Sequence, residues 1–261
     1  MPLRLQEPVP VKSSMRLAKG LFQRLGLDVR LTRNVQSHEV RTWEQTQNAL
    51  WRPFLAHHEI RTVIDVGANT GQFARLIHRI CPAAKVLSFE PLPDCRTELE
   101  ATLAQIPGSK SFPIALGDTT GTVPMHQSAF SPCSSLLNGT PQLGDDYPDA
   151  AIVNPIIVSL ERLDDVLTGE TLAPGLLVKL DVQGYEIPVI RGALQTLGRA
   201  AVVVVEVCFF RKLYQGQPLF DDIYQLLRGL GFTYMGCPEQ YPQKSDGRIV
   251  EADAVFERQP A

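Results

Sequence analysis

The sequence lacks several features that would assign it to a protein class directly. Its 261 residues contain no apolar run approaching about 18 residues, so no transmembrane helix is predicted. The N-terminus lacks the apolar core and small-residue cleavage site of a secretory signal. The five cysteines form no Cys-x-x-Cys pair, so we expect reduced thiols, no zinc site and a cytoplasmic protein. The net charge of −3 gives no electrostatic argument for a nucleic-acid partner.

The stretch that organises the chain lies at residues 61–71. Residues 61–66 form an apolar, β-branched run that is typical of a parallel strand buried on both faces. Gly67 permits a tight turn there, because it has no Cβ. Asn69 and Thr70 are good helix-capping types, and apolar residues recur at helical spacing from Phe73 onward. We therefore expect a strand, a glycine turn and a helix start.

The ligand of this turn follows from its glycines. Asn69 occupies the place of the second glycine in the dinucleotide fingerprint, and the Gly-Lys-Ser/Thr ending of a P-loop is absent. Glu90 ends the next apolar run at the spacing from Asp65 at which a carboxylate binds a ribose diol. This pattern indicates a nucleoside without a diphosphate, and S-adenosylmethionine is the commonest such ligand. The alternative is a purely structural turn. The predicted cofactor contacts are Asp65, Gly67, Ala68, Asn69, Gly71, Glu90 and Pro91.

Acidic residues follow three further predicted strands. Asp118 follows a strand expected at 112–116, where it would accept from the adenine amine; the alternative is a turn aspartate. Asp181 and Glu206 lie at the ends of strands expected at 176–182 and 201–207, so we expect them beside the cofactor. Asp181 is the first candidate for a general base, with Glu206 and His126 after it. Alternatively, both acids could hold a divalent cation, or pair structurally with Lys179 or Arg211.

The remaining elements complete an α/β pattern. Helices are expected at 42–58, 94–106, 161–167, 187–197 and 220–230, and short strands at 121–126 and 154–160. The polar loop 131–148 is interpreted as a lid or as part of an acceptor site. Residues 232–235 and 252–256 predict a final antiparallel hairpin, which would complete a seven-stranded, mostly parallel sheet.

The N-terminal segment stands apart from this pattern. Residues 1–60 are expected to be a helical extension of a domain at 61–261. Within it, residues 12–27 predict a basic amphipathic helix. Such a helix could contact an anionic membrane surface, or instead pack on the domain or on a second copy in a homo-oligomer.

Five motifs in order resemble those of the FkbM-type methyltransferases. They are the turn motif at 63–71, Phe89-Glu90-Pro91, the motif at 115–118, Ser134-Ser135-Leu136-Leu137, and the motif at 179–186 that contains Asp181 and Glu186. The resemblance implies a class I methyltransferase fold, Rossmann-like. It also implies S-adenosylmethionine as cofactor and O-methylation of a sugar, glycolipid, polysaccharide or polyketide hydroxyl. Ser134, Ser135 and Glu186 would then lie at the substrate or lid.

One position departs from the FkbM pattern. Gln183 stands where the family usually has Glu, so a carboxylate is excluded there. Two other classes remain open at this point: a noncatalytic adenosylmethionine-binding subunit and a nicotinamide-dependent oxidoreductase. The missing second glycine argues against the oxidoreductase, and the intact acids at Asp65, Glu90 and Asp181 argue against the noncatalytic subunit.

Overall fold

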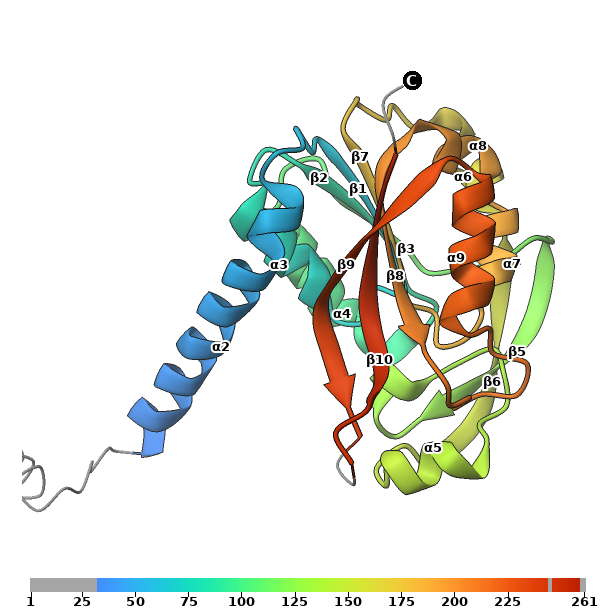
Figure 1. Cartoon of the computed structure of the whole chain (residues 1–261). Coiled ribbons are helices and arrows are strands. Elements are labelled where there is room, and N and C mark those ends of the chain that lie inside the picture. The colour runs from blue at the N-terminus through green and yellow to red at the C-terminus, as the bar shows by residue number, and fades with distance from the viewer. Residues whose placement is uncertain (1–31, 244–245, 259–261) are drawn as a thin grey trace, which may run out of the picture. The chain divides into compact units, whose positions relative to one another are not determined.

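The computed structural model describes residues 32–243 and 246–258 (Figure 1). Chain contacts divide the protein into two units, Met1–Thr46 and Gln47–Ala261. The described part of the first unit is helical and belongs to α2 (Thr32–Leu55), which continues into the second unit. The helix expected at 42–58 therefore begins at Thr32 and ends at Leu55. The helix expected at 12–27 lies outside the described residues.

A seven-stranded sheet forms the centre of the second unit, in the order β3-β2-β1-β7-β8-β10-β9. Neighbouring strands from β3 to β8 are parallel, whereas β10 is antiparallel to both β8 and β9. The predicted mostly parallel sheet with a C-terminal hairpin is confirmed. The strands are β1 (Thr62–Val66), β2 (Lys85–Phe89), β3 (Lys110–Phe112), β7 (Leu176–Leu180), β8 (Ala200–Cys208), β9 (Phe232–Pro242) and β10 (Ile249–Arg258).

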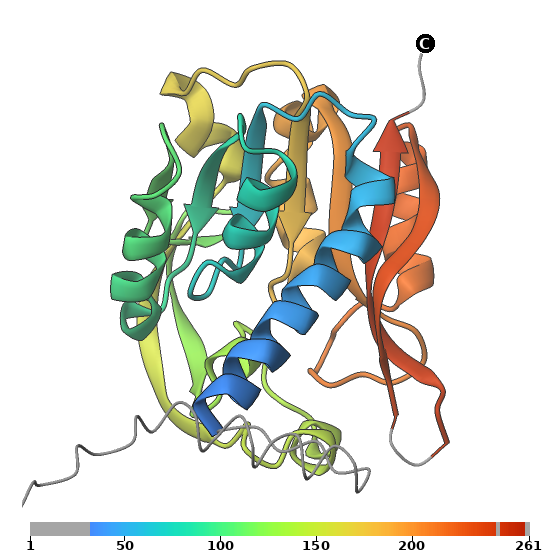
Figure 2. The ribbon, with the colours of Figure 1, turned by 90° about the vertical axis from the view of Figure 1, so that its left-hand side faces the viewer.

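Alternating side chains of the central strands build two separate cores. Val63 and Leu177 pack on one face, whereas their neighbours Ile64 and Val178 pack on the other. The first face is covered by α3 (Gln72–Ile80) and α4 (Pro93–Leu103), as Figure 2 shows. On the second face lie α6 (Leu163–Val166), the 3₁₀ turn η2 (Leu167–Gly169), α7 (Glu186–Arg191), α8 (Leu194–Arg199) and α9 (Phe220–Gly229).

A second, three-stranded sheet lies outside the large one and has the order β4-β6-β5. Its strands are β4 (Ala115–Leu116), β5 (Gly121–Ser128) and β6 (Ile152–Glu161), with the short helices η1 (Ser131–Cys133) and α5 (Pro141–Asp146) between β5 and β6. The single strand expected at 112–116 is therefore wrong. The chain leaves the large sheet after Phe112, because Pro113 has no N–H for a strand ladder and the next residues pair with β6 instead.

Other boundaries differ for identifiable reasons. The helix expected at 187–197 is two helices, with Gly192 and Ala193 between them. Gly192 packs closely against the backbone of Gly117, and a Cβ at residue 192 would lie 1.9 Å from the Gly117 carbonyl oxygen. The hairpin strands are longer than expected, so Glu239 belongs to β9 and not to the turn.

The structure bears on the cysteines and on membrane-spanning helices. All five cysteines are free, and all of them lie within the described residues. None of the described helices has the length and apolarity needed to cross a bilayer.

Candidate active site

The turn after β1 is held by backbone contacts on both sides. The N–H groups of Gly67 and Ala68 donate to the Phe89 carbonyl of β2 at 3.0 and 3.1 Å. On the other side, the Asp181 N–H donates to the Val66 carbonyl at 3.0 Å. Gly67 has φ +80°, and a Cβ there would lie 1.7 Å from the Asp181 carbonyl oxygen. Only glycine therefore allows the ends of β1 and β7 to approach this closely.

Helix α3 begins differently from the prediction. Its N-cap is Gly71, which has φ +86° and caps with no side chain, so the capping role expected of Asn69 and Thr70 is wrong. Asn69 itself has φ +46°, a conformation that asparagine tolerates better than most residues. Its amide donates to the Ser131 hydroxyl at 3.0 Å, which connects the turn to η1.

Glu90 holds the outer side of this turn. Its carboxylate accepts the Asn69 N–H and the Leu92 N–H, both at 2.8 Å. Burial raises the pKa of Glu90 to about 7, although the two N–H donors lower it. Each carboxylate oxygen makes one of these bonds and can accept another hydrogen bond.

Asp65 is a fully buried acid in β1, beside Lys179 in the sheet register. Neither of its carboxylate oxygens has a hydrogen-bond partner among the described residues. Burial raises the pKa of Asp65 to about 6, and the Lys179 charge limits the rise. Buried acceptors without partners are uncommon in native structures, so this carboxylate points to a donor supplied by a ligand or by water.

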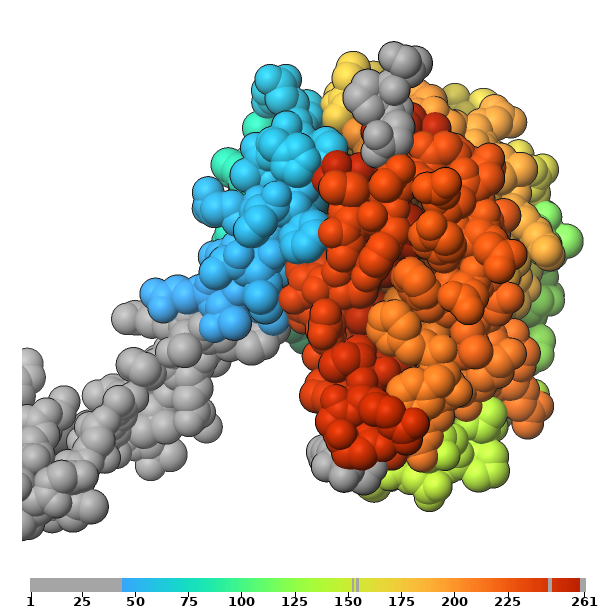
Figure 3. All heavy atoms as spheres, viewed as in Figure 1, coloured from blue at the N-terminus to red at the C-terminus, as the bar shows by residue number. Residues whose placement is uncertain are grey.

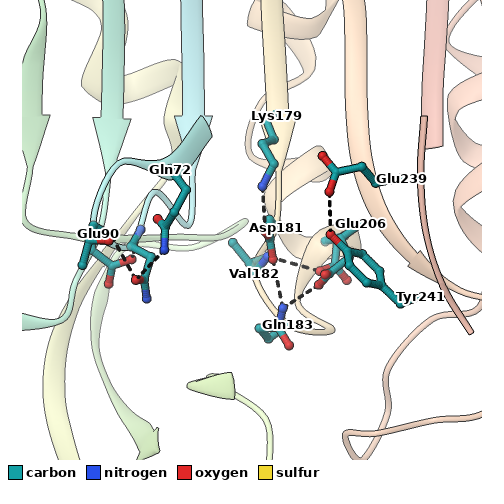
Figure 4. A network of polar contacts seen from close by, with 12 residues as sticks. Gln72, Glu90, Lys179, Asp181, Val182, Gln183, Glu206, Glu239 and Tyr241 are labelled. Atoms are coloured by element: carbon teal, nitrogen blue, oxygen red, sulfur yellow. Dashed lines mark hydrogen bonds and ion pairs between the residues drawn. The ribbon is translucent and has the colours of Figure 1, made fainter. Parts of the chain in front are cut away.

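The second half of the site is a network at the end of β7 (Figure 4). The Lys179 Nζ lies 2.6 Å from the Asp181 Oδ2, and it sits over the ring of Phe73. The Gln183 amide donates to the Asp181 Oδ1 at 2.9 Å and also to the Glu206 carboxyl. Asp181 and Glu206 hydrogen-bond each other as well. The two predicted acids are thus brought together, and Gln183 bridges them.

Charge divides this pair into one ionised and one protonated carboxyl. Burial alone would raise the pKa of Asp181, but the Lys179 ammonium and the hydrogen bonds outweigh it and lower the pKa. Burial, together with the Asp181 charge, raises the pKa of Glu206 well above its ordinary value. Burial also opposes the Lys179 charge, but the surrounding carboxylates raise its pKa. The network therefore favours a charged Lys179, an ionised Asp181 and a proton kept on Glu206.

The C-terminal hairpin contributes two more carboxyls to the site. The register of β10 on β8 places Asp253 directly opposite Glu206. Burial raises the pKa of Asp253 to about 7 despite the attraction of Lys179. Glu251, two residues earlier in β10, also has a raised pKa through burial, and it accepts the Tyr147 hydroxyl at 2.7 Å. The site is therefore rich in acids that share one nearby lysine.

The predicted lid residues reach the network through one contact. The Ser135 hydroxyl donates to the Gln183 carbonyl at 2.7 Å. The Ser134 hydroxyl is buried and accepts the Ser128 N–H, which makes it part of the loop's own structure. His126 pairs with Ser135 through backbone bonds, and it lines a separate cavity instead of contacting Asp181.

That cavity has a volume of about 620 Å³. Polar side chains contribute much of its lining, including those of His126, Asn138, Thr140 and Gln215. Gln215 follows Tyr214, whose hydroxyl donates to the Gln183 Oε1 at 2.9 Å. The cavity thus borders the residues that hold Gln183 in place.

The surroundings of three other predicted residues are as follows. Glu186 is buried and accepts the N–H groups of Gly184 and Val182, so its carboxylate holds the turn before α7. Asp118 follows β4 of the small sheet, not β3, and lies beside Gly192. The argument that put Asp118 at the adenine therefore no longer applies. Pro91 follows Glu90 and is half-buried.

Sequence reasoning missed several members of the site. Tyr214 is 1% exposed and bonds both Gln183 and the Cys133 carbonyl, but it lies in a loop with no motif. Asp253 was assigned only to a hairpin. Asp253 alternates with apolar residues in β10, and this pattern does not indicate which residue of a neighbouring strand lies opposite it. Gln183 was noted only as a departure from the FkbM pattern, although its side chain bonds Asp181, Glu206 and Tyr214.

The chain is similar to known methyltransferases in sequence. The model of the methyltransferase FkbM domain matches residues 65–234, well over half of the chain. The 2-O-methyltransferase NoeI of Sinorhizobium fredii is 27% identical over 72% of this chain and 77% of its own length. Methyltransferase sdnD of Sordaria araneosa is 30% identical over 50% of this chain and 59% of its own.

A third relative is the hexuronic acid methyltransferase AglP of Haloferax volcanii. It is 29% identical over 55% of this chain and 54% of its own length. The match therefore spans most of NoeI, but less than two-thirds of sdnD and AglP.

Proposed function

Since the chain belongs to the FkbM methyltransferase family and is an S-adenosylmethionine-dependent enzyme, we propose that it methylates a hydroxyl oxygen of a sugar-type acceptor. The observation that carries the proposal is the geometry of the Lys179–Asp181–Glu206 network, in which Lys179 lies 2.6 Å from Asp181 and the Gln183 amide bridges the two acids. Family membership also argues against the nicotinamide-dependent alternative. The names of two relatives, a 2-O-methyltransferase and a hexuronic acid methyltransferase, support an oxygen on a sugar.

The residues at the β1 turn fit the cofactor. The Gly67 cradle leaves no room for a Cβ, and the buried Asp65 carboxylate lacks a donor among the described residues. Glu90 keeps acceptor capacity for a ribose diol. In our proposal, Gly67, Ala68, Asn69 and Gly71 line the cofactor's nucleoside side, with Glu90 and Pro91 at the ribose. Asp118 stays a prediction without structural support.

Methyl transfer to a hydroxyl needs a positioned oxygen and an acceptor for its proton. The bound cofactor supplies a methyl group that is already activated by its sulfonium. Asp181 accepts the hydroxyl proton at its Oδ1, while Lys179 stays on Oδ2 and Gln183 fixes the carboxylate orientation. Because its pKa is lowered, Asp181 is a weak base. It therefore takes the proton as the new O–C bond forms, and not before.

In this proposal, the acceptor extends from Asp181 toward the cavity that His126 lines. Its hydroxyl, amide and imidazole side chains offer the donors and acceptors that sugar hydroxyls require. Ser135 and Tyr214 connect this cavity to the base through Gln183. His126 thus contacts the acceptor, and it is not the base.

Two conservative substitutions test the base. Asp181→Asn should keep cofactor affinity while lowering turnover at least about 100-fold, the low end for a lost general base. Glu206→Gln keeps a donor toward Asp181, so we expect less than a tenfold loss. The exposed Asp149→Asn serves as control. Turnover is measured as transfer of labelled methyl to a panel of glycoside hydroxyl acceptors, with adenosylhomocysteine affinity by calorimetry.

Other results would point elsewhere. If Asp181 only neutralises Lys179, Asp181→Asn should lower stability by several kcal/mol and leave the folded enzyme active. Cofactor binding without transfer to any acceptor would favour the noncatalytic subunit. A divalent cation shared by Asp181 and Glu206 would make wild-type turnover respond to magnesium and to a chelator.

Residues 12–27 add a proposal about partners. Their basic amphipathic pattern suits an anionic membrane surface, and packing on the domain or on a second copy is the alternative. Deletion of residues 1–33 should abolish binding to anionic vesicles without changing cofactor affinity. If the full chain binds no vesicles at low salt, the membrane proposal fails.

A further inference from the structure

Two histidines and a glutamate converge away from the candidate active site. His57 and His58 follow the end of α2, and Glu257 lies near the end of β10. Both Nε2 atoms lie 3.1 Å from the same Glu257 oxygen, Oε1. In the part of the chain that the structure describes, these three form the one group whose ligand atoms all lie within 4.8 Å of one another. In Figure 3 the light-blue segment after α2 borders the red hairpin.

A hydrogen bond to Glu257 explains the position of His57 but not that of His58. The His57 Nε2 is within hydrogen-bonding geometry of Glu257. The His58 Nε2 is buried and has no hydrogen-bond partner among the described residues, although it is equally near the carboxylate.

A metal ion satisfies all three groups at once. Bonds of about 2.0–2.1 Å in a tetrahedral site put neighbouring ligand atoms roughly 3.4 Å apart, close to the two observed separations. Two imidazoles and one carboxylate are ligands that suit zinc among the common divalent ions. A cavity of about 470 Å³ beside both histidines leaves room for a water as fourth ligand. Glu59 and Arg61 also line it, and their charges offset each other.

We propose that His57, His58 and Glu257 form a divalent transition-metal site that ties the segment after α2 to the last strand. Its position supports a structural role. The histidines precede β1, whereas the cofactor turn follows β1, so the two sites lie at opposite ends of the strand. The site joins residues 200 positions apart in sequence. Metal binding by residues so distant in sequence contributes directly to folding stability, because the unfolded chain does not hold the three ligands together.

The test uses the untagged full chain after chelator treatment. Calorimetry with zinc should show one site with a micromolar or tighter dissociation constant, and cobalt should give the visible absorption of a tetrahedral site. Zinc should raise the melting temperature. His58→Asn and Glu257→Gln should each weaken zinc binding at least tenfold and remove the thermal shift. His78→Asn, a histidine of α3 outside the cluster, is the matched control and should behave as wild type.

Three results would overturn the site. The wild-type chain could bind zinc no more tightly than about 100 µM, the ligand variants could retain wild-type affinity, or His78→Asn could lose as much affinity as they do. If His58→Asn or Glu257→Gln fails to fold, His57→Asn decides the question. The His57 side chain is 56% exposed, so its loss should not disturb packing, and it should still weaken zinc binding.

Discussion

Asp253→Asn should change how stability depends on pH. Asp253 lies in β10 directly opposite Glu206 in the strand register, and the nearby Asp181 charge disfavours its ionisation. The side chain is nearly buried, and burial raises its pKa from 3.8 to about 7 even though Lys179 attracts the ionised form. The folded protein thus keeps a proton on Asp253 at pH values where the unfolded chain has lost it.

The sign and size follow from that difference. A carboxyl whose folded pKa is raised contributes stability that is complete below its unfolded pKa and is lost as the pH rises through its folded pKa. At Asp253 the folded state binds about one more proton than the unfolded chain near pH 5, and about half a proton more at pH 7. At about 1.4 kcal/mol per pH unit and per proton, this group alone lowers the free energy of unfolding by about 2 kcal/mol over that interval.

The assay is urea unfolding of the cofactor-free protein at pH 5 and pH 8. Wild type should lose about 2.5 kcal/mol more between the two pH values than Asp253→Asn does. Other buried acids, such as Glu186, titrate in both proteins, so only the difference between them reports Asp253. The exposed Asp149→Asn should follow wild type. Parallel pH dependences in wild type and Asp253→Asn would refute the reasoning.

Two further predictions concern the turn after β1. The raised pKa of Glu90, about 7, means that adenosylhomocysteine affinity should increase up to about tenfold per pH unit toward pH 7 and then level off. Glu90→Gln should bind more weakly without that pH step; a flat wild-type profile from pH 6 to 8 would contradict this. Gly67→Ala should lower the melting temperature far more than Gly216→Ala. Both glycines have φ near +80°, but only at Gly67 does a Cβ meet backbone, while Gly216 has open space.

The sequence by itself determined the architecture. The apolar runs, the turn at Gly67 and the helical spacings between the runs predicted the strands β1, β2, β7 and β8 and their sequence along the chain. These signals are local in the chain. The same local signals placed Asp181 and Glu206 at the ends of neighbouring strands, which the structure confirms. They failed at Pro113 and Gly192, where a contact with another part of the chain breaks a pattern that reads as continuous.

Only the tertiary structure decided which groups carry charge. Whether Asp181 is ionised depends on its burial, on Lys179 two residues earlier in β7, and also on a hydrogen bond with Glu206 of another strand. Asp253 reaches this site through the register of β10, and Glu257 reaches His57 from 200 residues away. Burial and distance set pKa values and ligand geometry, and neither is encoded in the spacing of residues along the chain.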